Sequence, residues 1–258
     1  MSVAILETKN LGITFGAHQA VQDVSFSVKK NEFKSIIGPN GAGKTTLFNL
    51  LSGQLKPTKG DIYLKGQQIT KRSVVERTRL GIGRSFQITN VFPNLTVLEN
   101  VRLAVQSQAK LRYQAFTHYR SYQKFEEKAL HWLHVALLEH KENTLAINLA
   151  HGEKRKLEMA MLLALEPELL LLDEPTAGMS LEDVPAILQV IKKIKEEGDK
   201  TILLIEHKMD MIMDLSDRIM VLFNGKLLAE GTPREIMDNE MVQSAYLGGL
   251  YDEFTSQS

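Results

Sequence analysis

The sequence contains no cysteine and carries no excess of charge of either sign. Without cysteine, the 258-residue chain can form neither a disulfide scaffold nor a thiolate metal site. Its 31 basic and 31 acidic residues cancel, so nothing indicates a basic surface for nucleic acid or for an anionic membrane. We therefore expect no nucleic-acid partner, and the function has to be sought in particular residues.

Long apolar runs are missing as well. The richest apolar stretch, residues 159–172, is interrupted by Glu166, Pro167 and Glu168 and is too short to cross a bilayer. Residues 1–10 lack the basic and apolar regions of a secretory signal. We expect a soluble protein, large enough to bury a sizeable core, that reaches a membrane only through a partner.

The most informative stretch is a glycine-rich one. Residues 38–46 read GPNGAGKTT and match the pattern G-x-x-x-x-G-K-[ST], between a predicted strand at 34–37 and a predicted helix at 45–51. A chance match in a chain of this length has a probability on the order of one in a hundred. We predict a phosphate cradle formed by Gly38, Pro39, Asn40, Gly41, Ala42, Gly43, Lys44, Thr45 and Thr46.

Each part of this cradle has a physical role. Glycines allow backbone N–H groups to point inward, and the start of the helix adds partial positive charge. Lys44 supplies a full positive charge to the β- and γ-phosphates, and the Thr45 hydroxyl can ligate Mg²⁺. The stretch therefore predicts binding of a nucleoside triphosphate together with magnesium.

The remaining pattern predicts an α/β core with a helical insertion. Alternation of apolar and polar residues predicts antiparallel strands at 5–15, 21–28 and 61–67, with a turn at Lys65–Gly66. Helical spacing at 95–138 predicts the insertion. Alternating strands and helices then predict a parallel sheet, with strands at 169–173, 201–205 and 218–223, helices at 182–197 and 208–215, and a hairpin through Asn224–Gly225.

Polar residues follow two of the predicted parallel strands. Asp173 and Glu174 end the buried run 169–173, and His207 follows strand 201–205. Ligands of open α/β sheets bind at the carboxyl ends of strands, so these side chains should meet at one edge. Asp173 can hold Mg²⁺ through water, Glu174 can polarise an attacking water, and His207 can bond the γ-phosphate. Gln87, where the core passes into the insertion, offers an amide oxygen to Mg²⁺.

These motifs together carry a family resemblance. GPNGAGKTT, Gln87, LAHGEKR at 149–155, LLLLDEP at 169–175 and His207 occur in the order found in ABC transporter ATPase subunits, which the chain resembles over essentially its whole length. The resemblance implies a P-loop NTPase (RecA-like) core with an antiparallel β subdomain and an inserted α-helical subdomain. Within one ABC ATPase domain, it puts the core at about 1–87 and 165–232, the helical subdomain at about 88–164 and a helical tail at about 233–258.

The resemblance also assigns roles to residues that carry no signal of their own. Phe15 matches the aromatic residue that stacks on adenine, although a core aromatic is the alternative. Residues 177–180 match the loop where two subunits meet. The family signature L-S-G-G-Q is replaced by Leu149, Ala150, His151, Gly152 and Glu153.

The signature departs from the family at Ala150, which lacks the serine hydroxyl that touches the γ-phosphate of the opposite subunit. Loss of one hydrogen bond to a charged group costs roughly 1.5–3 kcal/mol. Gly152 still permits close backbone approach, and a helix predicted over 153–165 offers its N-terminus. His151 either replaces the lost contact or lies on the surface.

The implied mechanism is a head-to-tail pair with two ATP molecules between the P-loop of one subunit and the signature of the other. ATP contacts both subunits only in the closed state, so its binding favours closure. The implied partners are transmembrane permease subunits, a second ATPase subunit in a homo- or heterodimer and, for an importer, a solute-binding protein. The chain would lie peripherally at the cytoplasmic face of the membrane, with ATP and Mg²⁺ as its ligands.

The ATPase subunit of a transporter does not contact the transported substrate, the cargo. The candidate cargoes are therefore ranked by analogy with related transporters. LTVLENV at 95–101, the LAHG variant and the AYLGG at 245–249 resemble branched-chain amino-acid uptake systems. His151 and the stretch 177–179 are also similar to urea and short-chain amide importers. The ATPase of lipopolysaccharide export has similar core motifs.

Two other classes of protein share the P-loop. ABC proteins of DNA repair or of ribosomes carry long coiled coils or two ATPase halves, and this chain has one P-loop and neither extension. A small-molecule P-loop kinase would not need the signature. His131 and His134, three apart on a predicted helix with His140 beyond, suggest a solvated helix face more than a metal site.

Overall fold

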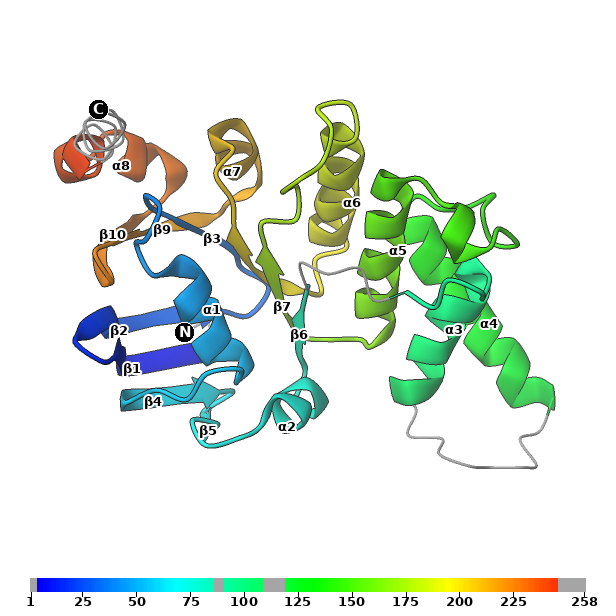
Figure 1. Cartoon of the computed structure of the whole chain (residues 1–258), viewed down its shortest axis with the longest axis horizontal. Helices are drawn as coiled ribbons and strands as arrows, with labels where there is room; N and C mark the ends of the chain where they lie inside the picture. The colour runs from blue at the N-terminus through cyan, green and yellow to red at the C-terminus, as the bar shows by residue number, and fades with distance from the viewer. Residues whose placement is uncertain (1–3, 86–90, 109–118, 246–258) are drawn as a thin grey trace. The chain divides into compact units, whose positions relative to one another are not determined.

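Two units of structure are assembled from segments that alternate along the chain. The computed structural model describes residues 4–85, 91–108 and 119–245 (Figure 1). The first unit comprises residues 1–82, 169–174 and 199–258, and the second comprises residues 83–168 and 175–198.

The first unit opens with an antiparallel sheet. Its strands are β1 (Ala4–Phe15), β2 (His18–Lys29), β4 (Lys59–Leu64) and β5 (Gln67–Gln68), in the order β2-β1-β4-β5. Lys65 and Gly66 both have positive φ and form the turn between β4 and β5. The antiparallel strands and this turn are confirmed at their predicted places.

A second, mostly parallel sheet forms the centre of the first unit. Its order is β10-β9-β3-β8-β7, with β6 (Ile82–Arg84) at the edge where the chain passes into the second unit. The strands are β3 (Phe33–Ile37), β7 (Leu169–Asp173), β8 (Thr201–Ile205), β9 (Arg218–Phe223) and β10 (Lys226–Gly231). β3 runs parallel to β8 and β9, β7 runs parallel to β8, and β10 is antiparallel to β9. The predicted parallel sheet and the hairpin at Asn224–Gly225 are confirmed.

Helix α1 (Lys44–Ser52) packs among residues of both sheets. Leu47, Phe48, Leu50 and Leu51 are fully buried in one apolar cluster with residues of β1, β2 and β7. The helix begins at Lys44, one residue before the predicted start. The glycine-rich loop is therefore anchored by a helix that the core holds along its length.

Helices α7 (Met209–Leu215) and α8 (Pro233–Met237) belong to a second apolar cluster of this unit. In it, Ile212 and Ile236 pack with Ile219 and Val221 of β9. Thr232 accepts a hydrogen bond from the Glu235 N–H and so caps α8. The parallel sheet is thus covered by helices, as the alternation of strands and helices predicts.

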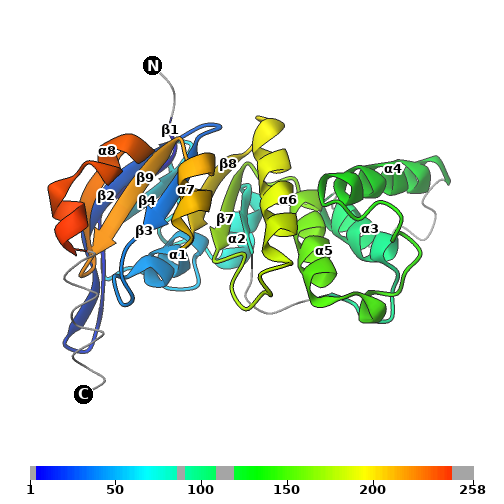
Figure 2. The same cartoon turned by 90° about the horizontal axis from the view of Figure 1, so that it is seen from above.

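The second unit is helical. It contains α3 (Val97–Gln108), α4 (Tyr119–Val135), the 3₁₀ turn η1 (Ala146–Asn148), α5 (His151–Ala164) and α6 (Val184–Glu196), with α3, α4 and α5 packed on one another (Figure 2). The helical nature of the insertion is confirmed. Helix α5 begins at His151, two residues before the predicted start, because Ala150 is the extended N-cap residue. The prediction that this helix starts at Glu153 was wrong.

Helix α2 (Val74–Arg79) was not predicted from the sequence. A capping box begins it, in which Ser73 and Glu76 each accept a hydrogen bond from the other's backbone N–H. The pattern Ser-x-x-Glu was the available signal, but the helix has only 6 residues and no apolar stripe to reveal it.

Arg77 joins α2 to the C-terminal end of α1. Arg77 is 1% exposed, and its guanidinium donates to the carbonyls of Leu50 at 2.6 Å and Leu51 at 2.8 Å, and further to those of Thr70 and Arg72. Burial lowers its pKa to about 10. Carbonyls in the last turn of α1 thus have a charged donor, and that of Leu50 also accepts the Gly53 N–H.

We predict that Arg77→Met lowers the free energy of unfolding by about 2–4 kcal/mol, because several carbonyls lose a charged hydrogen-bond donor. Urea unfolding followed by circular dichroism measures this change. Arg79→Met on the same helix is the matched control, since Arg79 is exposed, and it should change stability by less than about 0.5 kcal/mol. Equal losses of stability in both variants would contradict the role of Arg77 in joining α2 to the end of α1.

Candidate functional site

Two glycines of the loop 38–46 lie where no side chain fits. A Cβ on Gly38 would stand 2.2 Å from the Leu222 carbonyl oxygen, and one on Gly43 would stand 2.4 Å from the Ala20 carbonyl oxygen. Both residues have φ in the positive range, Gly43 at 96°. The loop is therefore pressed against the backbones of β9 and β2, which explains the glycine at each position.

The loop is also tied to the β9–β10 turn. The Gly225 N–H donates to the Ala42 carbonyl at 3.1 Å, and the Gln22 N–H donates to the Gly225 carbonyl at 2.7 Å. The Gln22 amide also donates to the Asn224 carbonyl at 3.2 Å. Sequence reasoning predicted this turn but not its contact with the loop, because backbone bonds between distant segments leave no local signal.

The side chain of Lys44 folds back over the glycine-rich loop. Its ammonium donates to the carbonyls of Gly38 at 2.7 Å and Pro39 at 3.0 Å. Burial lowers the pKa of Lys44, and the nearby carboxylates of Glu174 and Asp173 oppose the shift. Lys44 and the two acids therefore share one electrostatic environment, as expected for residues around a single phosphate site.

The ends of β7 and β8 bring Glu174 and His207 together. Asp173 pairs with Ile205 in the parallel ladder, and the Glu174 N–H donates to the Ile205 carbonyl at 2.9 Å. The His207 Nε2 then lies 2.8 Å from Glu174 Oε1. Glu174 has φ of 46°, a left-handed conformation that is uncommon for a residue with a side chain and often marks a functional position.

Two of the predicted magnesium ligands lie within the described residues of the first unit. Thr45 is exposed in the first turn of α1, and Asp173 is buried at the end of β7. A hydroxyl and a carboxylate are oxygen donors of the kind that Mg²⁺ takes, so this pair fits the ion. Gln87, the third predicted ligand, lies outside the described residues.

Phe15 ends β1 next to a turn. It pairs with His18 across the residues 16–17, and it is 48% exposed. The alternative that Phe15 is a core aromatic is therefore wrong. An exposed ring at the tip of the β1–β2 hairpin is available to stack on a flat ligand.

In the second unit, the signature forms the first turn of α5. Ala150 and His151 are exposed, while Gly152 is buried. Ala150 has no side-chain acceptor, but its N–H donates to Glu153 Oε2 at 3.0 Å, and Lys141 pairs with Glu153 Oε1 at 3.1 Å. Although burial acts in the opposite direction, these contacts hold the pKa of Glu153 below its usual range. Glu153 is thus fixed as a helix cap.

The loop 177–180 is connected to the same turn through Asp183. A Cβ on Gly152 would stand 2.8 Å from Asp183 Oδ1, so the carboxylate packs closely on this glycine. The Ser180 hydroxyl donates to Asp183 Oδ2 at 2.9 Å. Leu181 beside it is 87% exposed, which is unusual for so large an apolar side chain. The signature turn and this loop therefore form one connected surface.

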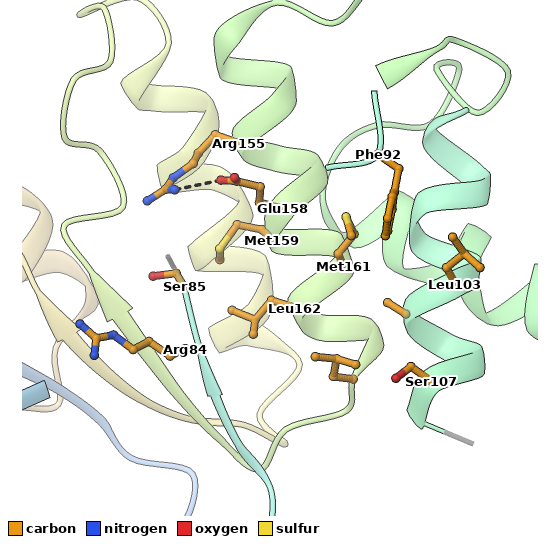
Figure 3. A pocket seen from close by; sticks show the side chains of 12 residues that line it. Arg84, Ser85, Phe92, Leu103, Ser107, Arg155, Glu158, Met159, Met161 and Leu162 are labelled. Atoms are coloured by element: carbon orange, nitrogen blue, oxygen red, sulfur yellow. Dashed lines mark hydrogen bonds and ion pairs between the residues drawn. The ribbon is translucent and has the colours of Figure 1, made fainter. Parts of the chain in front are cut away.

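A pocket of about 440 Å³ opens in the second unit between α3, α5 and the strand end at Arg84 (Figure 3). Its apolar lining includes Phe92, Met159, Met161 and Leu162. Arg155 lines it as well, and its guanidinium pairs with Glu158 at 2.9 Å. Figure 3 shows Phe92 and Leu103 on the side of the pocket opposite Arg155. Sequence reasoning did not identify this pocket.

Metal binding by the histidines finds no support. His131 and His134 are exposed on α4, and no group of three potential ligands occurs among the described residues. Within the same residues, no helix has the length and apolar character needed to span a bilayer.

The sequence matches the family model described as ABC transporter over residues 21–177. Residues 226–252 match the model described as branched-chain amino acid ATP-binding cassette transporter. The chain therefore belongs to the ATP-binding proteins of ABC transporters, which bind and hydrolyse ATP to drive transport.

Within this family, the chain is similar to LivG of Salmonella typhimurium, the high-affinity branched-chain amino acid transport ATP-binding protein. The two are 41% identical over 256 residues, which is 96% of this chain and 99% of LivG.

Solved structures agree with this assignment. The ADP conformation of the ATP-binding cassette MJ1267 matches with a TM-score of 0.79 and 30% identity over 95% of this chain and 99% of that one. The dimeric cassette MJ0796 matches with a TM-score of 0.73 and 30% identity over 89% of this chain and 99% of that one. The predicted ABC ATPase fold, with its antiparallel β subdomain, is confirmed.

We predict that Gly43→Ala destabilises the chain by about 2 kcal/mol more than Gly41→Ala. Both glycines have positive φ, but an added Cβ clashes with backbone only at Gly43, while Gly41 has open space around it. Urea unfolding without nucleotide compares the two variants. Similar losses would show that the loop is not held against β2.

Proposed function

We propose that the chain is the ATPase subunit of an importer of branched-chain amino acids. The similarity to LivG over nearly the full length of both chains carries this proposal, and the match of residues 226–252 to the branched-chain family model supports it. The alternatives are an importer of urea or short-chain amides and an exporter of lipids of the lipopolysaccharide type.

In the proposed reaction, the loop 38–46 binds the phosphates and Phe15 stacks on the adenine. Lys44 exchanges its two loop carbonyls for phosphate oxygens. Glu174 accepts a proton from the attacking water, and His207 orients both Glu174 and the γ-phosphate. The 2.8 Å contact between His207 and Glu174 supports their joint role.

Thr45, Asp173 and Gln87 would hold the magnesium ion. When bound, Mg²⁺ neutralises charge on the phosphate oxygens. Thr45 contributes a hydroxyl from the exposed side of α1, and Asp173 contributes a carboxylate from the end of the neighbouring strand. Both oxygens can also accept a hydrogen bond from a water molecule. Each group could therefore hold the magnesium ion either directly or through a bound water.

The second half of each ATP site would come from a second ATPase subunit. The N-terminal turn of α5 with Ala150, His151, Gly152 and Glu153 would face the γ-phosphate, using backbone N–H groups and the helix dipole in place of a hydroxyl. The exposed Leu181 next to the loop 177–180 supports a protein contact there. The dimeric form of MJ0796 is a precedent in a similar cassette.

The pocket beside Phe92 would receive the permease. It is lined mainly by apolar side chains, with charged residues Arg84, Arg155 and Glu158 among them, so an amphipathic cytoplasmic segment of a transmembrane subunit fits its chemistry. The chain would lie at the cytoplasmic face of the membrane, in a system that includes a solute-binding protein. Residues 88–164 would act as the helical subdomain and Gln87 as its link to the nucleotide.

We predict that Glu174→Gln retains ATP binding, lowers hydrolysis at least about 100-fold and favours the closed dimer, because the amide cannot accept the proton. Calorimetry, phosphate release and sedimentation measure the three effects. In cells that lack the native gene, the variant should not restore uptake of labelled leucine, whereas the wild type should. Normal turnover in this variant would remove Glu174 from the mechanism.

The same uptake assay separates the cargo alternatives. Restored uptake of labelled urea without leucine would favour the amide importer, and the absence of both with altered surface lipid would favour the exporter. Each of these outcomes leaves the ATPase activity intact, so the cargo and the chemistry are tested separately.

We predict that Phe92→Asp reduces co-purification of the membrane subunits by about tenfold and leaves the ATPase activity of the isolated chain unchanged, because a buried charge at the docking site is costly. Phe92 is 52% exposed, so folding should tolerate the change. Val75→Asp on α2 is the control, since Val75 is 59% exposed and lies in the other unit. Unchanged recovery of the membrane subunits with Phe92→Asp would exclude this pocket as the docking site.

A further inference from the structure

Glu206 is a buried acid in the loop that carries His207. It directly follows β8 and is 4% exposed, although glutamate is rarely buried unless its carboxylate has partners. Its Oε2 accepts hydrogen bonds from the backbone N–H groups of His207 at 2.8 Å and Lys208 at 3.3 Å. The side chain therefore folds back over the two residues that follow it.

This arrangement restricts the backbone from which His207 extends. A carboxylate that holds two successive N–H groups closes small rings and limits the dihedral angles between them. The His207 ring reaches Glu174 Oε1 at 2.8 Å, yet its side chain is 47% exposed. Because few neighbours can confine so exposed a ring, its direction has to be fixed mainly at the backbone.

Both members of the Glu174–His207 contact are thus anchored at the end of β8. The Glu174 N–H donates to the carbonyl of Ile205, the last residue of β8. The His207 N–H donates to the carboxylate of Glu206, which directly follows Ile205. A small rotation of the loop at residue 206 would move the imidazole but would leave the end of β7 in place. The orientation of the histidine therefore depends on an acceptor that takes no part in the chemistry.

We propose that Glu206 is a positioning residue that holds the His207 imidazole against Glu174 during ATP hydrolysis. It acts through hydrogen-bond acceptance, because its carboxylate accepts from the neutral backbone N–H groups of His207 and Lys208. The inference rests on the catalytic roles proposed for Glu174 and His207.

The test compares Glu206→Ala with Glu206→Gln in the full-length chain. We expect Glu206→Ala to lower kcat for ATP hydrolysis about tenfold, with KM and the Kd for ATP changed less than about twofold. Glutamine keeps an oxygen that can accept both hydrogen bonds, so Glu206→Gln should retain most of the wild-type kcat. Measuring Kd by calorimetry separates a lost alignment from a lost binding site.

A double-mutant cycle shows whether Glu206 acts through His207. In the His207→Ala background, Glu206→Ala should lower kcat no further, because the side chain that it positions is gone. Asp217→Ala is the matched control: Asp217 also accepts a backbone N–H, that of Phe33 at 2.8 Å, but at the opposite end of the parallel strands. Asp217→Ala should lower the melting temperature and leave kcat per folded molecule unaltered.

Three results would overturn the inference: an unchanged kcat in Glu206→Ala, equal loss in the alanine and glutamine variants, or a full additive loss in the double mutant. The proposed catalytic role of His207 is tested separately by the single His207→Ala variant. An unchanged kcat in His207→Ala would refute that role. If His207→Ala lowers kcat and Glu206→Ala lowers it further by its full single-mutant factor, only the positioning role of Glu206 would be refuted.

Discussion

Parallel pairing of β7 with β8 is the constraint on which the site depends. The ladder matches Asp173 with Ile205, and the next hydrogen bond, from the Glu174 N–H to the Ile205 carbonyl, extends the pairing by one residue. Beyond this point the strands separate, and Glu174 and His207 meet across the gap. A slip of β7 by one residue against β8 would turn the β7 side chains to the other face of the sheet and move Glu174 away from His207.

The buried and mostly apolar strands β7 and β8 maintain this register. All their residues are buried, so any slip would expose leucine and isoleucine to water or bury polar neighbours. β3 is buried in the same way and carries the glycine-rich loop at its end. The position of the reacting groups is therefore set by packing of residues that have no chemistry of their own.

The sequence predicted what depends on local pattern. Buried runs located β8 and β9 with their observed bounds, and the loop motif located the phosphate site. The start of α5 was misplaced because Ala150 caps the helix without a side-chain acceptor, and α2 was missed because one turn and a half of helix carries no periodicity. The hydrogen bond from the Gly225 N–H to the Ala42 carbonyl and the pocket beside Phe92 were not predictable, since each joins segments far apart in the chain.

Lys44 shows how folding prepares the loop. Its ammonium is already removed from bulk water and held by the carbonyls of Gly38 and Pro39, and burial lowers its pKa. The work of stripping water from this cation is therefore done when the chain folds, not when a nucleotide arrives. An incoming triphosphate meets a donor that has only to change acceptors, which keeps the loop in shape between successive turnovers.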